Sequence, residues 1–200
     1  MRRKNFSIRL LIFFVLALGS NWACDKKFSL VRLDEGLSAE ERMQLGMIYF
    51  KEGEIEPAKK QFQAVIFKER DNFSAWFYLA LTHHRLGEYK QAVKAFKNAR
   101  ALNPGSSETH NNLADCYLRL NELEWAEKEV KLALELGGDN IGYYHLTYAE
   151  LLFKKGEREM GCSELKQAEA FSNNDEAPKI LALELWEKNC AMDRNSKKAD

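Results

Sequence analysis

A 34-residue spacing of aromatic, small and turn-forming residues constrains this chain more than any other feature of its sequence. In the best-formed copy the pattern runs through Trp76, Leu79, Ala80, His83, Gly87, Tyr89, Ala92, Phe96, Ala99 and Pro104. A copy 34 residues earlier has Leu45, Gly46, Tyr49, Gly53, Ala58, Phe62 and Val65. A copy 34 residues later has His110, Leu113, Ala114, Tyr117, Asn121, Ala126 and Val130. After one additional residue near Asn140, a more degenerate fourth copy has His145, Ala149, Leu152, Gly156, Gly161 and Leu165.

This pattern resembles the tetratricopeptide repeat, a 34-residue helix–turn–helix unit. The resemblance covers about residues 39–175 and implies an all-α fold, a right-handed α-solenoid of four helix hairpins plus a C-terminal capping helix. The predicted hairpins span 39–72, 73–106, 107–141 and 142–175. The capping helix is predicted over 176–192, where Ala182, Leu183 and Trp186 repeat the apolar spacing of a first helix, and a disordered tail over 193–200.

The turn residues support this organisation. Gly53, Gly87, Asn121 and Gly156 fall where each first helix should end, and glycine or asparagine is favoured there because the chain turns left-handed. We therefore expect each hairpin to turn at one of these four positions.

The four histidines also have structural positions in the repeat. His83 takes the place of a packing tyrosine, and His110 and His145 take the place of Trp76. His83 and His84 are neighbours that diverge by about 100° on a helix, so they are unable to bind one metal together. Because no catalytic, phosphate-binding or metal-ligand motif is present, we expect no enzyme activity, no cofactor, no metal and no small-molecule substrate.

The concave side of such a solenoid is lined by the first helix of each unit, and it is the predicted binding surface for a partner helix or peptide. The alternatives are that these side chains pack on one another or on the N-terminal tether, or that a partner uses the convex face. The predicted groove residues are Met43, Met47, Phe50, Phe77, Leu81, His84, Asn111, Asp115, Leu118, Tyr143, Leu146, Glu150 and Phe153.

A row of cations lies near the end of each first helix, at Lys51, Arg85, Arg119 and Lys154. The row is able to bind carboxylate or phosphate, or alternatively to complement the helix dipoles. In the repeats that hold chaperone C-terminal tails, lysine and asparagine form a carboxylate clamp early in the first unit. Met43 and Met47 occupy those positions here, which argues against that ligand.

Three cysteines lie within the repeat region. Cys116 falls inside a first helix and is expected to be a small buried residue. Cys162 and Cys190 fall at about the same level on two helices predicted to be antiparallel, so an oxidising compartment would allow a disulfide between them.

The N-terminus reads as an export signal at 1–23. Arg2, Arg3, Lys4 and Arg9 precede a short apolar run, which is typical of a secretory signal peptide. Cys24 follows Ala23 in a sequence that resembles the lipobox of bacterial lipoproteins, with Asn21 where a leucine is usual. We expect lipidation at Cys24 and a polar tether at 24–38, or alternatively cleavage that leaves a soluble periplasmic or secreted protein.

Together these features predict a non-catalytic protein–protein interaction scaffold of the bacterial cell envelope, anchored to a membrane by lipid. The order of signal, cysteine, tether and repeats resembles the type IV pilus biogenesis lipoproteins, which implies assistance to assembly of an envelope machine such as a pilus or secretin. A soluble periplasmic chaperone or regulator, or an accessory subunit of an enzyme complex, is the alternative. The charges balance, with 30 basic and 30 acidic residues, so no nucleic-acid partner is expected.

Overall fold

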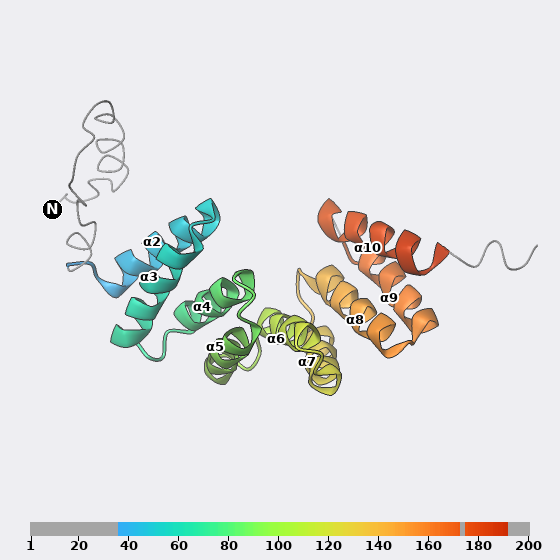
Figure 1. The fold of residues 1–200 in the computed structure, drawn as a ribbon, viewed down its shortest axis with the longest axis horizontal. Helices are drawn as coiled ribbons and strands as arrows, with labels where there is room; N and C mark the ends of the chain where they lie inside the picture. The colour runs from blue at the N-terminus through green and yellow to red at the C-terminus, as the bar shows by residue number, and fades with distance from the viewer. Residues whose placement is uncertain (1–35, 173–174, 192–200) are drawn as a thin grey trace, which may run out of the picture. The chain divides into compact units, whose positions relative to one another are not determined.

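The computed structural model describes residues 36–172 and 175–191, and in these residues helices are the only regular secondary structure. The first two hairpins are α2 (Ala39–Glu52) with α3 (Ile55–Lys68), and α4 (Phe73–Arg85) with α5 (Tyr89–Leu102). The next two are α6 (Ser107–Arg119) with α7 (Leu123–Leu136), and α8 (Ile141–Lys155) with α9 (Arg158–Ala170). α10 (Glu176–Asn189) follows the fourth hairpin (Figure 1).

The repeat sets where the helices begin. The first helices begin at residues 39, 73, 107 and 141, so they are 34 residues apart throughout. The second helices begin at residues 55, 89, 123 and 158, so the fourth is one residue late. The additional residue is taken up in α8, which has 15 residues where α6 has 13. α8 therefore begins one residue before the start predicted for the fourth unit.

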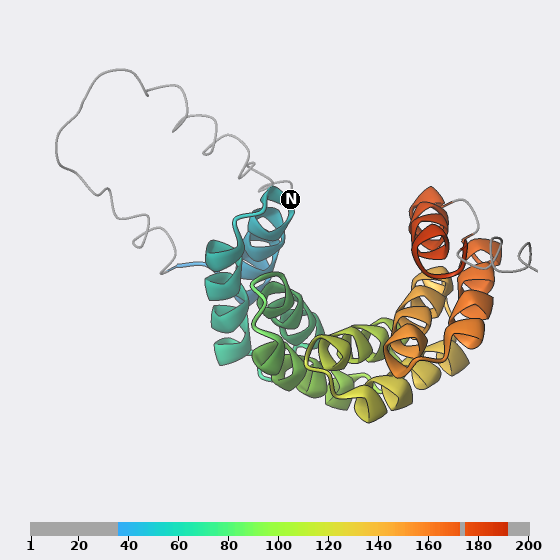
Figure 2. The same cartoon turned by 45° about the vertical axis from the view of Figure 1, so that its right-hand side comes forward.

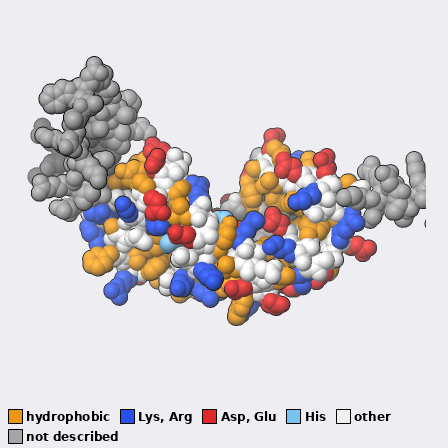
Figure 3. All heavy atoms as spheres, in the orientation of Figure 1, with side chains coloured by type: hydrophobic (Ala, Val, Ile, Leu, Met, Phe, Trp, Pro, Cys, Tyr) orange, Lys and Arg blue, Asp and Glu red, His pale blue; other side chains and the backbone are white. Residues whose placement is uncertain are grey.

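Stacking of the hairpins gives the helical unit, residues 37–191, the form of an arc. The first helices and α10 follow its inner side and the second helices its outer side (Figure 2). This is the all-α solenoid predicted from the sequence, and the prediction is confirmed. In Figure 3 the surface is hollowed between α2 and α10, and the hollow carries both basic and acidic side chains. Among the described helices, none has the length and apolar character needed to cross a bilayer.

The predicted turn residues have the expected backbone. The φ angles of Gly53, Gly87 and Gly156 are 82°, 73° and 80°, and Asn121 has a φ of 59°. In α2 and α8 the left-handed glycine is the C-cap, and its N–H donates to carbonyls of the last helical turn. Each turn is therefore closed by the residue type that the register predicts.

Small residues allow the two helices of each hairpin to pack closely. Ala58, Ala92 and Ala126 are fully buried at one position of the second helices, and Phe62 and Phe96 fill the space one turn later. Interiors packed in this way tolerate little change in volume. These residues belong to the main core cluster, which extends from α2 to α8.

Gly161 explains why the fourth copy departs from the pattern. A Cβ at this position would lie 2.5 Å from Cε1 of Phe153. Because the Phe153 ring lies on the backbone of α9, alanine does not fit where the other copies have it. The glycine is thus a consequence of the large neighbour on α8.

α10 belongs to a second core cluster with α8 and α9. Leu146, Leu165 and Ala182 form its buried centre, and Leu185 and Trp186 pack against it. Leu183, in contrast, is 53% exposed, so its expected place on the buried face of the capping helix is wrong. The buried face of α10 contains Pro178 and Ala182, so Ala182 lies where it was expected and Leu183 does not.

Candidate functional site

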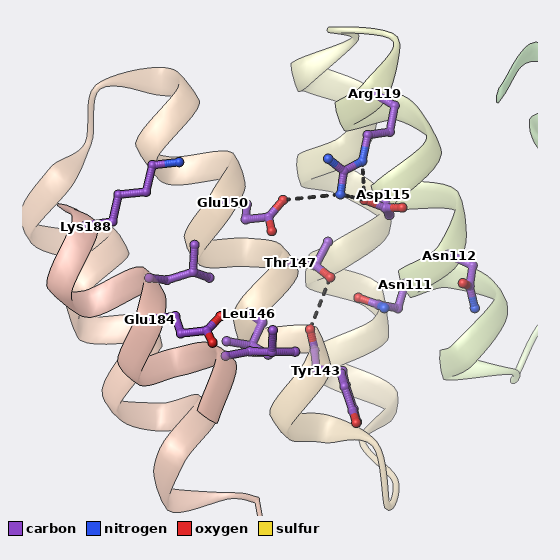
Figure 4. A pocket seen from close by; sticks show the side chains of 12 residues that line it. Asn111, Asn112, Asp115, Arg119, Tyr143, Leu146, Thr147, Glu150, Glu184 and Lys188 are labelled. Carbon is purple, nitrogen blue, oxygen red and sulfur yellow. Dashed lines mark hydrogen bonds and ion pairs between the residues drawn. The ribbon is translucent and has the colours of Figure 1, made fainter. Parts of the chain in front are cut away.

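A pocket of about 460 Å³ lies on the inner side of the arc, between α6, α8 and α10 (Figure 4). We call it the concave pocket. Its lining consists of Asn111, Asn112, Asp115 and Arg119 from α6, Tyr143, Leu146, Thr147 and Glu150 from α8, and Leu181, Glu184, Leu185 and Lys188 from α10. Helical spacing of three and four residues puts the members of each set on one helix face. Three successive inner helices therefore contribute one face each.

A chain of hydrogen bonds and ion pairs crosses the inner side of the arc and ends in this pocket. His84 Nε2 on α4 contacts Asp115 Oδ2 on α6, and Arg119 Nε donates to Asp115 Oδ1 at 3.1 Å. Arg119 Nη2 lies 3.7 Å from Glu150 Oε2 on α8, so its guanidinium stands between the two carboxylates (Figure 4). The ion pairs thus link the first helices of the second, third and fourth units.

The two carboxylates of this chain have opposite electrostatic environments. Burial by itself raises the pKa of Asp115, but the hydrogen bond from His84 and the charge of Arg119 outweigh it, and the pKa is lowered. Burial raises the pKa of Glu150, and there Arg119 offsets the effect only in part. The Asp115 charge is therefore well compensated in the folded protein, whereas the Glu150 charge is not.

Polar and apolar groups divide the pocket lining. The side-chain oxygen of Asn111 is buried and has no hydrogen-bond partner. Leu146 is buried, while Leu181 remains 42% exposed on the opposite wall. Tyr143 donates its hydroxyl hydrogen to Asp175 Oδ2 at 3.1 Å, which ties α8 to the start of α10.

Five of the predicted groove residues come together in the concave pocket, and the others do not. Asn111, Asp115, Tyr143, Leu146 and Glu150 line it. The sequence prediction missed the contribution of α10, because it treated that helix only as a cap. The signal was present in the spacing of Leu181, Glu184, Leu185 and Lys188, which repeats the i, i+3, i+4, i+7 pattern of one helix face.

Two of the predicted groove residues, Phe50 and Leu118, are buried core residues instead. Leu118 is 1% exposed and Phe50 is 8% exposed. The guanidinium of Arg85 covers the Phe50 ring, with Cζ 3.7 Å from the ring centroid. Neither side chain lines the concave pocket.

The remaining predicted groove residues are half-buried. Met43, Met47, Phe77 and Leu81 pack against the main core cluster. Phe153 lies over the backbone of α9, as described above. These side chains serve packing between helices with much of their surface, in line with the alternative of self-packing.

The row of cations caps helices. Arg85 Nη1 donates to the carbonyl oxygen of Phe50 at 2.8 Å, and Lys154 Nζ donates to that of Leu118 at 2.9 Å. Arg85 and Lys154 thus each satisfy a carbonyl at the C-terminal end of the preceding first helix, where they also complement the helix dipole. Lys51 lies in the last turn of α2, and Arg119 instead contacts Asp115 and Glu150 in the concave pocket.

Each histidine is paired with a carboxylate. His83 Nδ1 lies 2.5 Å from Glu88 Oε2, and His145 Nδ1 lies 2.7 Å from Glu164 Oε2. Within the described ranges, no group of three or more His, Cys, Asp or Glu is placed to hold a metal ion. The sequence register predicted the positions of the histidines but not these partners.

The most deeply buried pair joins the second and third units. His110 Nδ1 lies 2.6 Å from Glu129 Oε2, and His110 Nε2 lies 3.0 Å from the carbonyl oxygen of Pro104. Arg100 contacts the other Glu129 oxygen, and Glu129 is 2% exposed. Trp76 Nε1 donates to the carbonyl oxygen of Arg70 in the same way, so His110 keeps the tryptophan's backbone contact and adds an ion pair.

Cys162 on α9 and Cys190 at the end of α10 form a disulfide, with their Cα atoms 6.0 Å apart. Nearby, Arg158 Nε donates to the carbonyl oxygen of Asn189 at 2.5 Å. Cys116 is buried and free, and burial raises the pKa of its thiol to about 12. The disulfide therefore fastens to α9 the helix that forms the third wall of the concave pocket.

The predicted signal peptide, the lipidation site Cys24, most of the tether and the tail at 193–200 lie outside the described residues.

Comparison with known families decides the class of the chain. Two family models, both described as "Tetratricopeptide repeat", match residues 43–107 and 84–151, which together cover more than half of the sequence. The chain belongs to the tetratricopeptide-repeat family. The fold is that of a protein–protein interaction scaffold, and proteins built from this repeat are generally non-catalytic.

Two curated relatives are longer than this tetratricopeptide-repeat protein. BBSome complex member BBS4 of Bos taurus is 28% identical over 138 residues, which is 68% of this chain and 26% of the relative. DnaJ homolog subfamily C member 3 of Gallus gallus is 22% identical over 168 residues, which is 76% of this chain and 33% of the relative. The chain thus spans about a quarter to a third of the length of these relatives.

Solved structures of bacterial tetratricopeptide-repeat proteins share the fold. TTC0263 of Thermus thermophilus has a TM-score of 0.66 at 22% identity, with 76% of this chain and 82% of that chain covered. PilF of Pseudomonas aeruginosa has a TM-score of 0.65 at 16% identity, covering 75% and 68%. MamA of Desulfovibrio magneticus has a TM-score of 0.63 at 16% identity, covering 70% and 78%. At these identities the likeness concerns the fold alone.

Proposed function

We propose that this protein is a scaffold of the bacterial cell envelope that binds a segment of a partner protein in the concave pocket and along the adjacent inner helices. The observation that carries the proposal is the pocket itself, where three inner helices present apolar and polar side chains around about 460 Å³. A concave site with an apolar wall and a few polar groups suits a peptide or helix ligand.

The envelope assignment rests on the N-terminal sequence. The basic and apolar residues before Cys24 favour export, and the lipobox-like cysteine favours a lipid anchor on a membrane facing the periplasm. The disulfide between Cys162 and Cys190 also suits an oxidising compartment such as the periplasm. Assistance to assembly of an envelope machine such as a pilus or secretin is the specific role we propose. The order of export signal, cysteine, tether and repeats resembles the type IV pilus biogenesis lipoproteins, and PilF has the same repeat fold.

Binding in the concave pocket is tested by a matched pair of substitutions on α10. Leu181 lines the pocket and is 42% exposed, whereas Ile180 lies outside it and is 53% exposed. Leu181→Lys puts a charge into the pocket, and Ile180→Lys puts the same charge on an open surface of the same helix. Partner affinity should fall at least tenfold for L181K, an effect of about 1.4 kcal/mol, and should be unchanged for I180K.

Equal effects of the two lysines would reject the concave pocket as the binding site. Circular dichroism of both variants provides the control for folding, since both replaced side chains are largely exposed. The lipid anchor is tested separately by mass spectrometry of the exported protein. An acylated N-terminal cysteine at residue 24 is expected, whereas an unmodified N-terminus would favour the free periplasmic regulator.

A further inference from the structure

The charges around the concave pocket are unevenly paired. Asp115 has both His84 and Arg119 as close partners. Glu150 has only the 3.7 Å contact with Arg119, and Glu184 has no ion pair among the described residues. Lys188 has none there either. The pocket lining has three carboxylates, Asp115, Glu150 and Glu184, against two cations, Arg119 and Lys188, so it carries one net negative charge.

Glu150 in particular lacks a sufficient counter-ion. It is half-buried at the centre of the pocket, and the pKa of its carboxyl is raised chiefly by burial. Removing a carboxylate from water is unfavourable unless another charge or hydrogen bonds compensate it. A ligand that brings a positive charge next to Glu150 would supply the missing compensation.

The apolar wall limits the shape of such a ligand. Leu146 on α8 and Leu185 on α10 line the pocket and belong to the second core cluster, and Leu181 lines the pocket from α10 as well. Long basic side chains lay their methylene groups along apolar surface and keep the charged head in a polar place. An aliphatic stem with a cationic head matches this lining, whereas a compact cation would leave the leucines wet.

Asn111 adds an adaptable polar group to the α6 wall. Its side-chain oxygen has no hydrogen-bond partner, although it is buried. Turning the amide toward the pocket therefore breaks no hydrogen bond of that oxygen. Figure 4 shows Asn111 on the wall that faces Tyr143 and Thr147.

We propose that the concave pocket receives a lysine or arginine side chain of the bound partner segment. Its charged head lies at Glu150 and Glu184, and its stem lies against Leu146 and Leu185. The inference rests on the proposed function, because it names the chemistry of the segment that the scaffold binds.

Substitutions of Lys188 and of Glu150 should change the affinity for a basic peptide in opposite directions. It lines the same pocket, acts electrostatically on Glu150, and lies one helical turn after Glu184. Its ammonium group lowers the pKa of Glu150, as that of Lys154 also does, and it lines the pocket, so an incoming cation competes with it. Lys188→Met should therefore strengthen binding of a basic peptide, whereas Glu150→Gln should weaken it.

The experiment uses four blocked pentapeptides with leucine on either side of a central arginine, lysine, glutamate or norleucine. Each is titrated into the 15N-labelled protein, and amide shifts of α6, α8 and α10 report binding. The arginine and lysine peptides should bind at least tenfold more tightly than the glutamate and norleucine peptides. For the arginine peptide, E150Q should raise the Kd about tenfold and K188M should lower it severalfold.

Three results would overturn the inference. The first is equal affinity for the norleucine and arginine peptides, which would leave the proposed function intact and remove the cation. The second is a loss of affinity in K188M, which would make that lysine a ligand group. The third is the absence of shifts in the pocket at millimolar arginine peptide. Failure of the proposed function is recognised separately, by a partner whose affinity responds equally to L181K and I180K.

Discussion

The disulfide between Cys162 and Cys190 should determine how firmly α10 is held, and the expected effect can be worked out from the structure. The two cysteines are separated by 28 residues, and a cross-link that closes a loop of this length stabilises the folded state by about 3.5 kcal/mol in the chain-entropy model. A difference of 3.5 kcal/mol corresponds to roughly a 300-fold change in an unfolding equilibrium.

The effect should be concentrated at the C-terminal end of the helical unit. α10 packs mainly through the small cluster around Leu165 and Ala182, which is separate from the main core. In stacked repeats each unit is stabilised by its neighbours only, so a terminal helix opens first. Loss of the cross-link should therefore open α9 and α10 well before the first three hairpins unfold.

Hydrogen exchange measured by mass spectrometry provides the assay. The oxidised protein is compared with the reduced protein and with a Cys162→Ser, Cys190→Ser double variant. Peptides from α10 should exchange up to about 300-fold faster in both cross-link-free forms, while peptides from α4 and α5 should be unchanged. Addition of reductant to the double variant should have no effect, which provides the control for Cys116. Identical exchange of α10 in oxidised and reduced protein would refute the reasoning.

Four further substitutions follow from the packing and the charges. Glu129→Gln removes the buried carboxylate that contacts both Arg100 and His110, so urea denaturation should show a loss of about 1.5–3 kcal/mol. An unchanged midpoint would contradict the buried pairs. Gly161→Ala should cost about 1–3 kcal/mol because its Cβ meets the Phe153 ring, and Phe153→Leu in the same chain should recover most of it; an equal loss with and without that change would exclude the contact. The pKa of Asp115 is lowered in the folded protein, so the stabilisation from its charge is present above about pH 4 and is lost as the pH falls through the folded pKa. Asp115→Asn should therefore destabilise the protein at pH 7. The pKa of Glu150 is raised, so its charge destabilises the folded protein at pH 7, and Glu150→Gln should be neutral or stabilising there. Thermal melts in which Glu150→Gln is less stable than Asp115→Asn would contradict the charge analysis.

The repeat pattern predicted the fold because each signature position has one physical requirement. Gly53 and Asn121 are needed where the backbone turns left-handed, and alanines are needed where two helices touch. These requirements act within one hairpin, so they are readable from a single 34-residue window. The register therefore predicted the start of each first helix to within one residue, whereas the capping helix, predicted to run to 192, ends at Asn189.

The candidate site was less predictable, because it depends on contacts between units. Phe50 has the spacing of an inner-face residue, but Arg85 from the next unit covers it. Leu118 is buried, although Asn111 and Asp115 on the same face are only half-buried. The third wall of the concave pocket depends on the rotation of α10, which buries Ala182 and leaves Leu183 exposed. Sequence spacing gives the face of a helix but not how far the neighbouring helix overlaps it.

Site-specific photocrosslinking tests the central claim most directly. A photoreactive residue is placed at Thr147, which lines the concave pocket, or at Gln167, which is exposed on the second helix of the same hairpin. The full-length protein carrying either probe is irradiated in a cell that expresses it together with its natural partners. We expect a discrete crosslinked partner from position 147 that is lost on L181K and retained on I180K, and none from position 167. A partner captured from position 167 alone would place binding on the outer face and contradict the account.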